Sequence, residues 1–350
     1  MIHQASKNNI FEFNRDCLVQ WFEEHGIRPF RADQVMRWVY NRKATSFDEM
    51  TNINKALRDR LSNHFAIDGL TMIEAQQSAD GTRKLCFALK DDTRIESVLI
   101  GEKDHYTVCI SAQAGCAMGC TFCMTAKNGL VRNLTAGEII GQVMAAQQLT
   151  PDDKPLSNIV LMGMGEPLAN YDNVMQALDI ITDAENGLKF ASRRITLSTA
   201  GIVPKIGALG KNRKIKLAIS LNAPDNETRS RLMPINRRYP IEKLLDACRA
   251  YDRIHRDRIT FEYILLKDVN DSPVHARKLA KLLAPIRGKI NLIPYNPHDG
   301  SEFMRPEKYA IEAFQAILVE KHYTTMIRWS KGDDISAACG QLAGRKAGAA

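Results

Sequence analysis

The spacing of apolar residues changes about one third of the way along the chain. Residues 10–66 repeat apolar side chains at helical intervals, as in "DCLVQWFEEHG" and "ADQVMRWVYNRK", with basic residues between them. The segment "GTRKLCFALKDDTRIESVLI" then alternates apolar and polar residues on both sides of "DD", which is typical of a β-hairpin. We therefore predict a small helical domain over 1–70 and a β-hairpin extension over 71–104.

From residue 105 the pattern becomes one of short apolar strands separated by helices. Two of these helices have recognisable starts, with Thr135 and Glu138 in capping-box spacing and Ser272 placed as N-cap before Pro273. A third helix is expected to open with Pro306 and Glu307. Strands that alternate with helices form parallel βαβ units. We predict an α/β fold, a partial (β/α)6-type TIM barrel over 105–344, with a flexible tail over 345–350. The expected strands are 106–111, 158–163, 194–199, 215–220, 259–265, 289–294 and 325–329.

Composition and charge narrow the function classes only slightly. A chain of 350 residues with 45% hydrophobic content can bury a large core. Its 48 Lys and Arg against 40 Asp and Glu give a net charge of +8, which favours nucleic acid or another polyanion as a partner. The start "MIHQASKNNIFEF" lacks the apolar core of a signal peptide, and no apolar run is long enough to span a bilayer. We expect a soluble, cytoplasmic protein without a membrane partner.

Four of the eight cysteines fall within fifteen residues: Cys109 lies inside the first expected barrel strand, and the other three follow directly after it. Of these, Cys116, Cys120 and Cys123 have CxxxCxxC spacing in "GCAMGCTFC". Three thiolates on one loop leave one corner of an iron–sulfur cluster open for a small molecule. A structural zinc site normally has a fourth ligand close by, and no second CxxC or HxxxH pair follows. An open cluster is the favoured interpretation, with structural zinc as the alternative.

The cysteine motif is the signature of radical S-adenosylmethionine enzymes, and the resemblance extends along the chain. The segments "MGMGEPLAN", "LSTAG", "ISLNAP", "LMPINRRYP", "IPYNPH" and "DISAACGQL" follow it in the order of the RlmN/Cfr family of ribosomal RNA adenine methyltransferases. This resemblance covers about residues 90–344 and makes 105–344 a radical SAM core. Pro167 in "GMGEP" is closer to the RlmN branch, which methylates carbon 2 of adenine, than to the Cfr branch, which methylates carbon 8.

The resemblance implies where two cofactors bind. Each implied position lies at or just beyond an expected strand's C-terminal end, the face on which barrel enzymes collect their sites. Taken singly, each would be an ordinary turn residue, and Asn222 stands where many relatives have histidine. One 4Fe–4S cluster would be held by Cys116, Cys120 and Cys123, and S-adenosylmethionine would be contacted by Gly165, Glu166, Ser198, Ser220, Leu221, Asn222 and Asn296.

The resemblance also implies how the methyl group travels, with two S-adenosylmethionine molecules used per turnover. One would methylate Cys339 in "AACGQL", and the other would be cleaved to a 5′-deoxyadenosyl radical that takes hydrogen from the S-methyl group. The carbon radical would add to adenine, and Cys109 would form a disulfide with Cys339 to release the product. Glu96 matches the family's proton acceptor. Without the resemblance, Cys109 would be a buried strand cysteine and Glu96 a solvated strand residue.

The implied substrate is an adenosine of 23S ribosomal RNA at the peptidyl-transferase centre, with adenosine 37 of tRNA as a further candidate. A ring carbon is reached only in an unstacked base, so we expect a flipped or loop adenosine. The basic runs 211–216, 229–238 and 249–258 would line the RNA path, or else form the outer faces of barrel helices. The helical domain over 1–70 is a further candidate RNA contact. A reducing donor such as flavodoxin or ferredoxin would supply electrons.

Three other functions remain open at this point. The nearest is a Cfr-type carbon-8 methyltransferase, which the position of the methyl group on adenosine would reveal. The second is a radical enzyme for a small molecule or a protein, which would turn over without RNA. The third is a non-catalytic RNA-binding module that carries zinc or a cluster, for which one zinc without iron or sulfide would be diagnostic.

Overall fold

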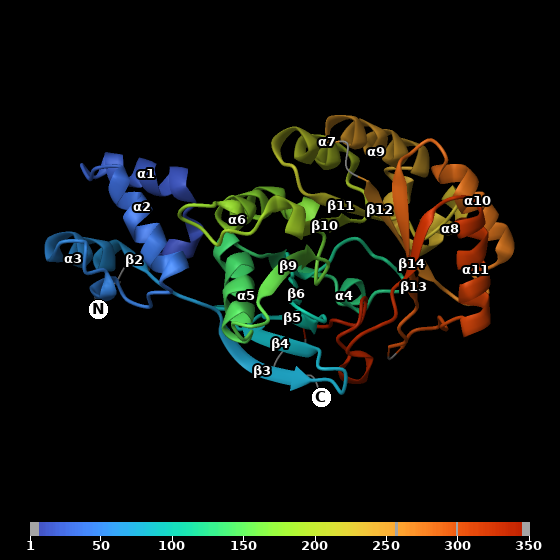
Figure 1. The fold of residues 1–350 in the computed structure, drawn as a ribbon, viewed down its shortest axis with the longest axis horizontal. Helices are drawn as coiled ribbons and strands as arrows, with labels where there is room; N and C mark the ends of the chain where they lie inside the picture. Colours follow the sequence, from blue (N-terminus) through green and yellow to red (C-terminus); the bar gives the residue numbers. More distant parts are fainter. Residues whose placement is uncertain (1–6, 256–257, 299, 345–350) are drawn as a thin grey trace.

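The structure is a computed structural model that describes residues 7–255, 258–298 and 300–344. A ten-stranded sheet runs through it in the order β14-β13-β12-β11-β10-β9-β6-β5-β4-β3. Helices cover the parallel part of this sheet, and the N-terminal helices lie to one side, next to α5 and α6 (Figure 1). The predicted α/β class with a partial barrel is confirmed. The tail predicted over 345–350 lies outside the described residues.

The first part of the chain is helical, as its periodicity predicts. Asn14 and Asn54 are the N-cap residues of the first and third helices, and each side chain accepts a backbone N–H from the first turn. Glu12 joins this region to the barrel, because its carboxylate accepts from Thr135 Oγ1 at 2.5 Å and from Gly137 N at 3.1 Å. The elements are β1 (Asn8–Asn9), α1 (Arg15–Glu24), α2 (Phe30–Met36), α3 (Lys55–His64) and β2 (Phe65–Ala66).

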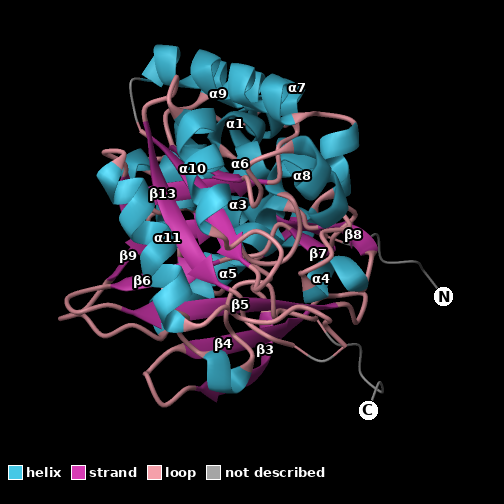
Figure 2. Ribbon diagram, turned by 90° about the vertical axis from the view of Figure 1, so that its right-hand side faces the viewer, coloured by secondary structure: helices cyan, strands magenta, loops and turns pink. Residues whose placement is uncertain are grey.

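The segment expected to form a hairpin has three antiparallel strands, and they continue the barrel sheet. The predicted pair is β4 (Arg83–Ala88) with β5 (Arg94–Gly101), and β5 pairs in turn with the first parallel strand. The additional strand, β3 (Thr71–Gln77), was missed because nearly all of its residues are exposed and its apolar positions do not alternate. The extension is therefore one wall of the barrel region, which Figure 2 shows below the helices.

The parallel strands begin and end close to the predicted positions, because buried apolar runs define them. In β12, for example, all residues but Ile264 are buried. A small hairpin of β7 (Gln113–Gly115) and β8 (Leu130–Asn133) encloses the cysteine loop and the short α4 (Met124–Lys127). The parallel strands are β6 (Tyr106–Cys109), β9 (Leu156–Leu161), β10 (Ile195–Thr199), β11 (Lys216–Ser220), β12 (Ile259–Leu265), β13 (Gly288–Pro294) and β14 (Thr324–Ile327).

Two of the three predicted helix starts are confirmed, and the third helix begins later than expected, at Lys308 after Glu307 as N-cap. Thr135 and Glu138 form a reciprocal capping box, and Ser272 caps the helix that begins with Pro273. The helices of the barrel region pack in pairs, α5 with α6, α7 with α9 and α10 with α11. Their bounds are α5 (Ala136–Gln148), α6 (Tyr171–Thr182), α7 (Val203–Asn212), α8 (Asn226–Leu232), α9 (Ile241–His255), α10 (Pro273–Leu283) and α11 (Lys308–Glu320).

Candidate active site

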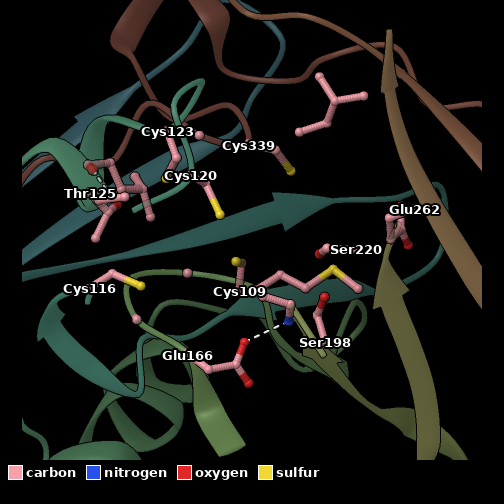
Figure 3. A pocket seen from close by; sticks show the side chains of 18 of the residues that line it. Cys109, Cys116, Cys120, Cys123, Thr125, Glu166, Ser198, Ser220, Glu262 and Cys339 are labelled. Atoms are coloured by element: carbon pink, nitrogen blue, oxygen red, sulfur yellow. Dashed lines mark hydrogen bonds between the residues drawn. The ribbon is translucent and has the colours of Figure 1, made fainter. Parts of the chain in front are cut away.

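A cavity of about 190 Å³ lies at the C-terminal ends of the parallel strands. Cys109 reaches it from the end of β6, three more cysteines reach it from the loop before α4, and Cys339 reaches it from the far end of the chain (Figure 3). The fold therefore brings together thiols that are separated by up to 230 residues in sequence, from position 109 to position 339. The cysteines in the wall are Cys109, Cys116, Cys120, Cys123 and Cys339.

The cysteine loop is held by its own hairpin. Cys116 N donates to Gly129 O at 2.8 Å, and Gly115 has φ +75°, where a Cβ would lie only 1.9 Å from the same oxygen. Only glycine fits this crossing of the two strands. Phe122 of the loop is buried and packs in a small apolar cluster that includes Leu232. The loop that presents the three motif cysteines is thus fixed at both its backbone and its side chains.

The electrostatics of the loop suit a cationic cluster. Burial, with a smaller contribution from the charge of Cys123, raises the pKa of Cys116 to about 11 and that of Cys120 well above its ordinary value. Bound metal offsets such penalties, because it favours the thiolate form. Among the described residues, no three Cys, His, Asp or Glu side chains converge to hold one metal ion. Three thiolates on one loop fit a 4Fe–4S cluster, which takes each thiolate on a different iron and leaves the fourth iron open.

The loop after β9 is built around one buried carboxylate. Glu166 Oε1 accepts from Leu168 N at 3.0 Å, and Oε2 accepts from Ala200 N at 2.6 Å. Burial raises the pKa of Glu166, and these backbone N–H groups lower it. Gly165 has φ +94°, and a Cβ there would lie 2.4 Å from Gln113 Cβ. Gly165 and Glu166 both line the cavity, while the Glu166 carboxylate joins the loops that follow β9 and β10.

The structure brings five of the seven predicted S-adenosylmethionine contacts into the cavity wall, namely Gly165, Glu166, Ser198, Ser220 and Asn222. The other two lie elsewhere. Leu221 is fully buried in the main core, and its carbonyl accepts from the Arg229 guanidinium. Asn296 is buried and donates through Nδ2 to Cys339 O at 3.2 Å. The structure thus shows Leu221 as a core residue and Asn296 as an anchor of the segment that carries Cys339.

The segment around Cys339 is anchored through its backbone. Met124 N donates to Gly340 O at 2.8 Å, and Thr125 Oγ1 donates to Leu342 O at 2.6 Å. Both donors belong to α4, which directly follows the cysteine loop. Cys339 itself is exposed, and it lines the cavity. The anchors therefore hold Cys339 next to the cysteine loop.

Cys109 and Cys339 are within electrostatic reach of each other. Burial raises the pKa of Cys109 to about 12, and the charge of Cys339 adds to this effect. Surrounding protein also raises the pKa of Cys339, which the positive charge of Arg328 opposes. Arg328 also lines the cavity, so one cation faces both thiols. Such an arrangement suits thiol chemistry, in which the thiolate is the nucleophile.

Glu96 lies in a neighbouring groove and not in the cavity wall formed by the described residues. Its Oε2 accepts from Ala343 N at 2.8 Å and Gly344 N at 3.2 Å, and Lys84 Nζ lies 3.8 Å from Oε1. The carboxylate therefore contacts the chain four and five residues beyond Cys339. Its predicted role as proton acceptor stays a prediction.

One prediction about the basic runs is wrong at its first residue. Arg229 opens the run 229–238, yet its side chain is fully buried. Its guanidinium donates to the carbonyls of Ala200, Ser220 and Leu221 at 2.7–3.2 Å and to Asn236 Oδ1 at 3.0 Å. Arg229 therefore ties the ends of β10 and β11 together, and its side chain is not on the surface. Charge spacing alone did not reveal this.

Two further charged residues of the cavity were also missed. Glu262 lies on β12 and Arg328 directly follows β14, and both line the cavity. In the sequence each is only a charged residue next to apolar ones. A single charged residue within the largely apolar run 259–265 is the signal that would have marked Glu262.

Comparisons with known proteins place the chain in a family. Residues 8–67 match the ribosomal RNA large subunit methyltransferase N-terminal domain, and residues 110–280 match the radical SAM superfamily. A dual-specificity RNA methyltransferase RlmN of Desulfosudis oleivorans is 56% identical over 97% of this chain and 91% of the relative. The chain belongs to the RlmN family of radical S-adenosylmethionine RNA methyltransferases.

A second relative and one solved structure agree with this placement. The enzyme of the same name from Syntrophus aciditrophicus is 50% identical over 96% of this chain and 97% of its own. The crystal structure of a radical SAM methyltransferase from Sphaerobacter thermophilus is 42% identical, with a TM-score of 0.91 over 97% of this chain and all of the other. The radical SAM family implies S-adenosylmethionine and a 4Fe–4S cluster as cofactors. Among the helices of the described residues, none has the length and apolar content needed to cross a bilayer.

Proposed function

We propose that this enzyme methylates carbon 2 of an adenosine in 23S ribosomal RNA and adenosine 37 of tRNA, with Cys339 as the methyl carrier and Cys109 as the releasing thiol. The observation that carries the proposal is the presence of Cys109 and Cys339 in one cavity with the three motif cysteines. The relatives' names, which specify dual RNA specificity, support two classes of RNA substrate. A cytoplasmic enzyme reduced by flavodoxin or ferredoxin fits this proposal.

The motif cysteines and the strand ends supply the cofactor sites. Cys116, Cys120 and Cys123 would hold the cluster, which when bound would supply the electron for reductive cleavage of S-adenosylmethionine. Gly165 and Glu166 form the end of the cavity for the methionine part, and the hydroxyls of Ser198 and Ser220 offer hydrogen bonds along it. Asn222 is less available to hydrogen-bond the cofactor, because its Oδ1 already accepts from Ile264 N at 2.9 Å.

Cys339 solves a problem of reactivity. Carbon 2 of adenine lies between two ring nitrogens and is too electron-poor to attack an ordinary methyl donor. The Cys339 sulfur instead takes a methyl group from one S-adenosylmethionine: the new sulfur–carbon bond forms as the sulfonium–methyl bond breaks, and S-adenosylhomocysteine leaves. Arg328 favours the Cys339 thiolate that this displacement requires. Hydrogen removal from the methyl group then allows its carbon to bond to the base.

Cys109 and Glu96 complete the cycle. The Cys109 thiolate attacks the sulfur of Cys339, which forms a disulfide as the bond between that sulfur and the methylene carbon breaks. Glu96 accepts the proton from carbon 2 as the adduct gives up its unpaired electron, which the oxidised cluster would take back. When the sulfur–carbon bond breaks, its electron pair stays on the methylene carbon, which takes up a proton and becomes the methyl group of the product. Because Glu96 bonds Ala343 and Gly344, movement of the Cys339 segment would free its carboxylate for this step.

Mapping the methyl group on the RNA tests the proposal. Reconstituted enzyme is incubated with S-adenosylmethionine, a reductant and either 23S ribosomal RNA or tRNA, and the digested nucleosides are analysed by mass spectrometry. We expect 2-methyladenosine from both RNAs. Detection of 8-methyladenosine would indicate the Cfr-type reaction, and S-adenosylmethionine cleavage without any RNA methylation would indicate a different substrate. One zinc per chain without iron after anaerobic preparation would contradict catalysis through a cluster.

A further inference from the structure

One side chain of the cavity wall has an unused hydrogen-bonding atom. Glu262 is 5% exposed, and its Oε2 has no hydrogen-bond partner within the described part of the chain. Its Oε1 is already engaged, because Asn291 Nδ2 donates to it at 3.0 Å. A buried carboxylate oxygen without a donor is unfavourable and rare in native proteins. A free acceptor in the wall of a ligand cavity points to a donor on the ligand.

The register of the sheet places Glu262 next to a proposed cofactor residue. Glu262 is paired with Ser220 on β11 and with Asn291 on β13. Residues in register on neighbouring parallel strands point to the same face of a sheet. Ser220 and Glu262 both line the cavity, and Figure 3 shows Ser198 and Ser220 between Glu166 and Glu262. The polar residues of the wall therefore follow one another across the sheet, from Glu166 after β9 to Glu262 on β12.

Arg328 keeps Glu262 suited to accepting hydrogen bonds. Its Nη1 lies 3.9 Å from Glu262 Oε1, and its backbone N donates to Leu292 O at 2.8 Å. The guanidinium thus stands beside the oxygen that Asn291 already holds, which leaves Oε2 open. A cation at this distance favours the ionised carboxylate, the form that accepts through both oxygens.

We propose that Glu262 binds the ribose hydroxyls of S-adenosylmethionine. With the methionine part at Gly165 and Glu166 on the β9 side, the order of the wall brings the nucleoside part to β12. A ribose diol presents two neutral O–H donors, which match one free carboxylate oxygen better than an aromatic base edge with its single amino group. This inference rests on the proposed function for the direction in which the cofactor lies.

Ligand analogues test the contact without requiring catalysis. S-adenosylhomocysteine and its 2′-deoxy and 3′-deoxy analogues are titrated by calorimetry into the cluster-reconstituted full chain, as wild type and as Glu262→Gln. We expect removal of at least one hydroxyl to weaken binding to the wild type by about 10-fold or more, as for a hydrogen bond to a charged group. The same removal should change binding to Glu262→Gln by less than about 3-fold.

Controls separate this contact from general effects. Glu312→Gln removes an exposed carboxylate on α11, and it should bind every ligand as the wild type does. If Glu262→Gln does not fold, the same titrations with Glu262→Asp, compared with the analogue series on the wild type, test the contact instead. Binding of S-adenosylhomocysteine does not depend on where, or whether, a base is methylated. A failed methyl mapping would therefore leave this measurement intact.

Three results would overturn the inference. The first is that both deoxy analogues bind the wild type as tightly as the parent ligand. The second is that removal of the adenine amino group, and not of a hydroxyl, produces the loss that Glu262→Gln abolishes. The third is that Glu262→Gln weakens binding of an RNA fragment while binding of S-adenosylhomocysteine is unchanged, which would place Glu262 against the RNA.

Discussion

Glu166 and Glu262 line the same cavity, but their carboxylates have different surroundings. Both oxygens of Glu166 accept backbone N–H groups, whereas Glu262 has one oxygen held by Asn291 and one without a donor among the described residues. Burial raises the pKa of both side chains. The Glu166 carboxylate is therefore used to hold the loops that shape the methionine end of the cavity, whereas Glu262 keeps one oxygen available to a ligand.

The two arginines near the cavity differ in the same way. Arg229 is fully buried and donates to backbone carbonyls and to Asn236, so it belongs with Glu166. Arg328 stands near Glu262 and the thiols of Cys109 and Cys339, so it belongs with the reactive groups. The comparison predicts that substitutions of Glu166 or Arg229 reduce the free energy of unfolding. Substitutions of Glu262, Arg328 or the two thiols should instead reduce activity or ligand binding.

The largest expected effect is on the two thiols. Cys109→Ala should stop turnover and accumulate a covalent enzyme–RNA adduct, because no thiol remains to attack the Cys339 sulfur. Cys339→Ala should neither methylate RNA nor form an adduct, while both variants melt within a few degrees of the wild type. Denaturing gels and thermal melts make the measurement. Normal turnover by Cys109→Ala would remove that residue from the mechanism.

The next effect is on the stability that Arg229 provides. Arg229→Met would leave three buried carbonyls and Asn236 Oδ1 without their donor, at about 1–3 kcal/mol for each group left unpaired. We expect the free energy of unfolding to fall by more than about 3 kcal/mol in a urea titration, with Arg229→Lys losing less. A loss below about 1 kcal/mol would show that the bonds between the ends of β10 and β11 are dispensable.

A matched pair of substitutions tests the carboxylates directly. Glu166→Gln turns one acceptor into a donor that faces a backbone N–H, which should lower the free energy of unfolding by about 1.5–3 kcal/mol. Glu262→Gln removes a buried charge with an unpaired oxygen, so the unfolding free energy should stay the same or rise slightly. Denaturant titrations of the ligand-free proteins compare the two. Equal losses would contradict the division into structural and ligand-binding carboxylates.

The smallest effect is a pH dependence. Burial, opposed by Arg328, raises the pKa of Glu262 above its unfolded value of about 4.3. The stability that a raised acid contributes is fully present below the unfolded pKa and is lost as pH rises through the folded pKa. The stability of the wild type relative to Glu262→Gln should therefore decrease from pH 4 towards neutrality. A difference between the two proteins that does not change with pH would show that Glu262 titrates normally.

The sequence was most informative where one local pattern determines one structural feature. Apolar runs such as 259–265 marked the parallel strands, and the Thr135 capping box marked the start of α5. The spacing of the cysteine motif predicted a site with an open corner. β3 was missed because an exposed edge strand has no buried face to impose alternation.

Features of the site that depend on contacts between distant parts of the chain could not be predicted from the local spacing of residues. Cys109 and Glu96 were identified only through the family resemblance, because a cysteine or a glutamate on a strand has no distinctive spacing. Arg229 was placed with the exposed basic residues, since burial depends on carbonyls that are close only after folding. Likewise, the free oxygen of Glu262 becomes visible only when β11, β12 and β13 are in register.

The most direct test of the central claim is to follow a methyl group through Cys339. The enzyme is first loaded with S-adenosylmethionine carrying a deuterated methyl group, freed of small molecules, and analysed by mass spectrometry of the peptide that contains Cys339. It is then given RNA, a reductant and unlabelled S-adenosylmethionine for one turnover. We predict a deuterated S-methyl group on Cys339, and then deuterium in the 2-methyladenosine formed. Active enzyme with an unmodified Cys339, or product without deuterium, would contradict the account.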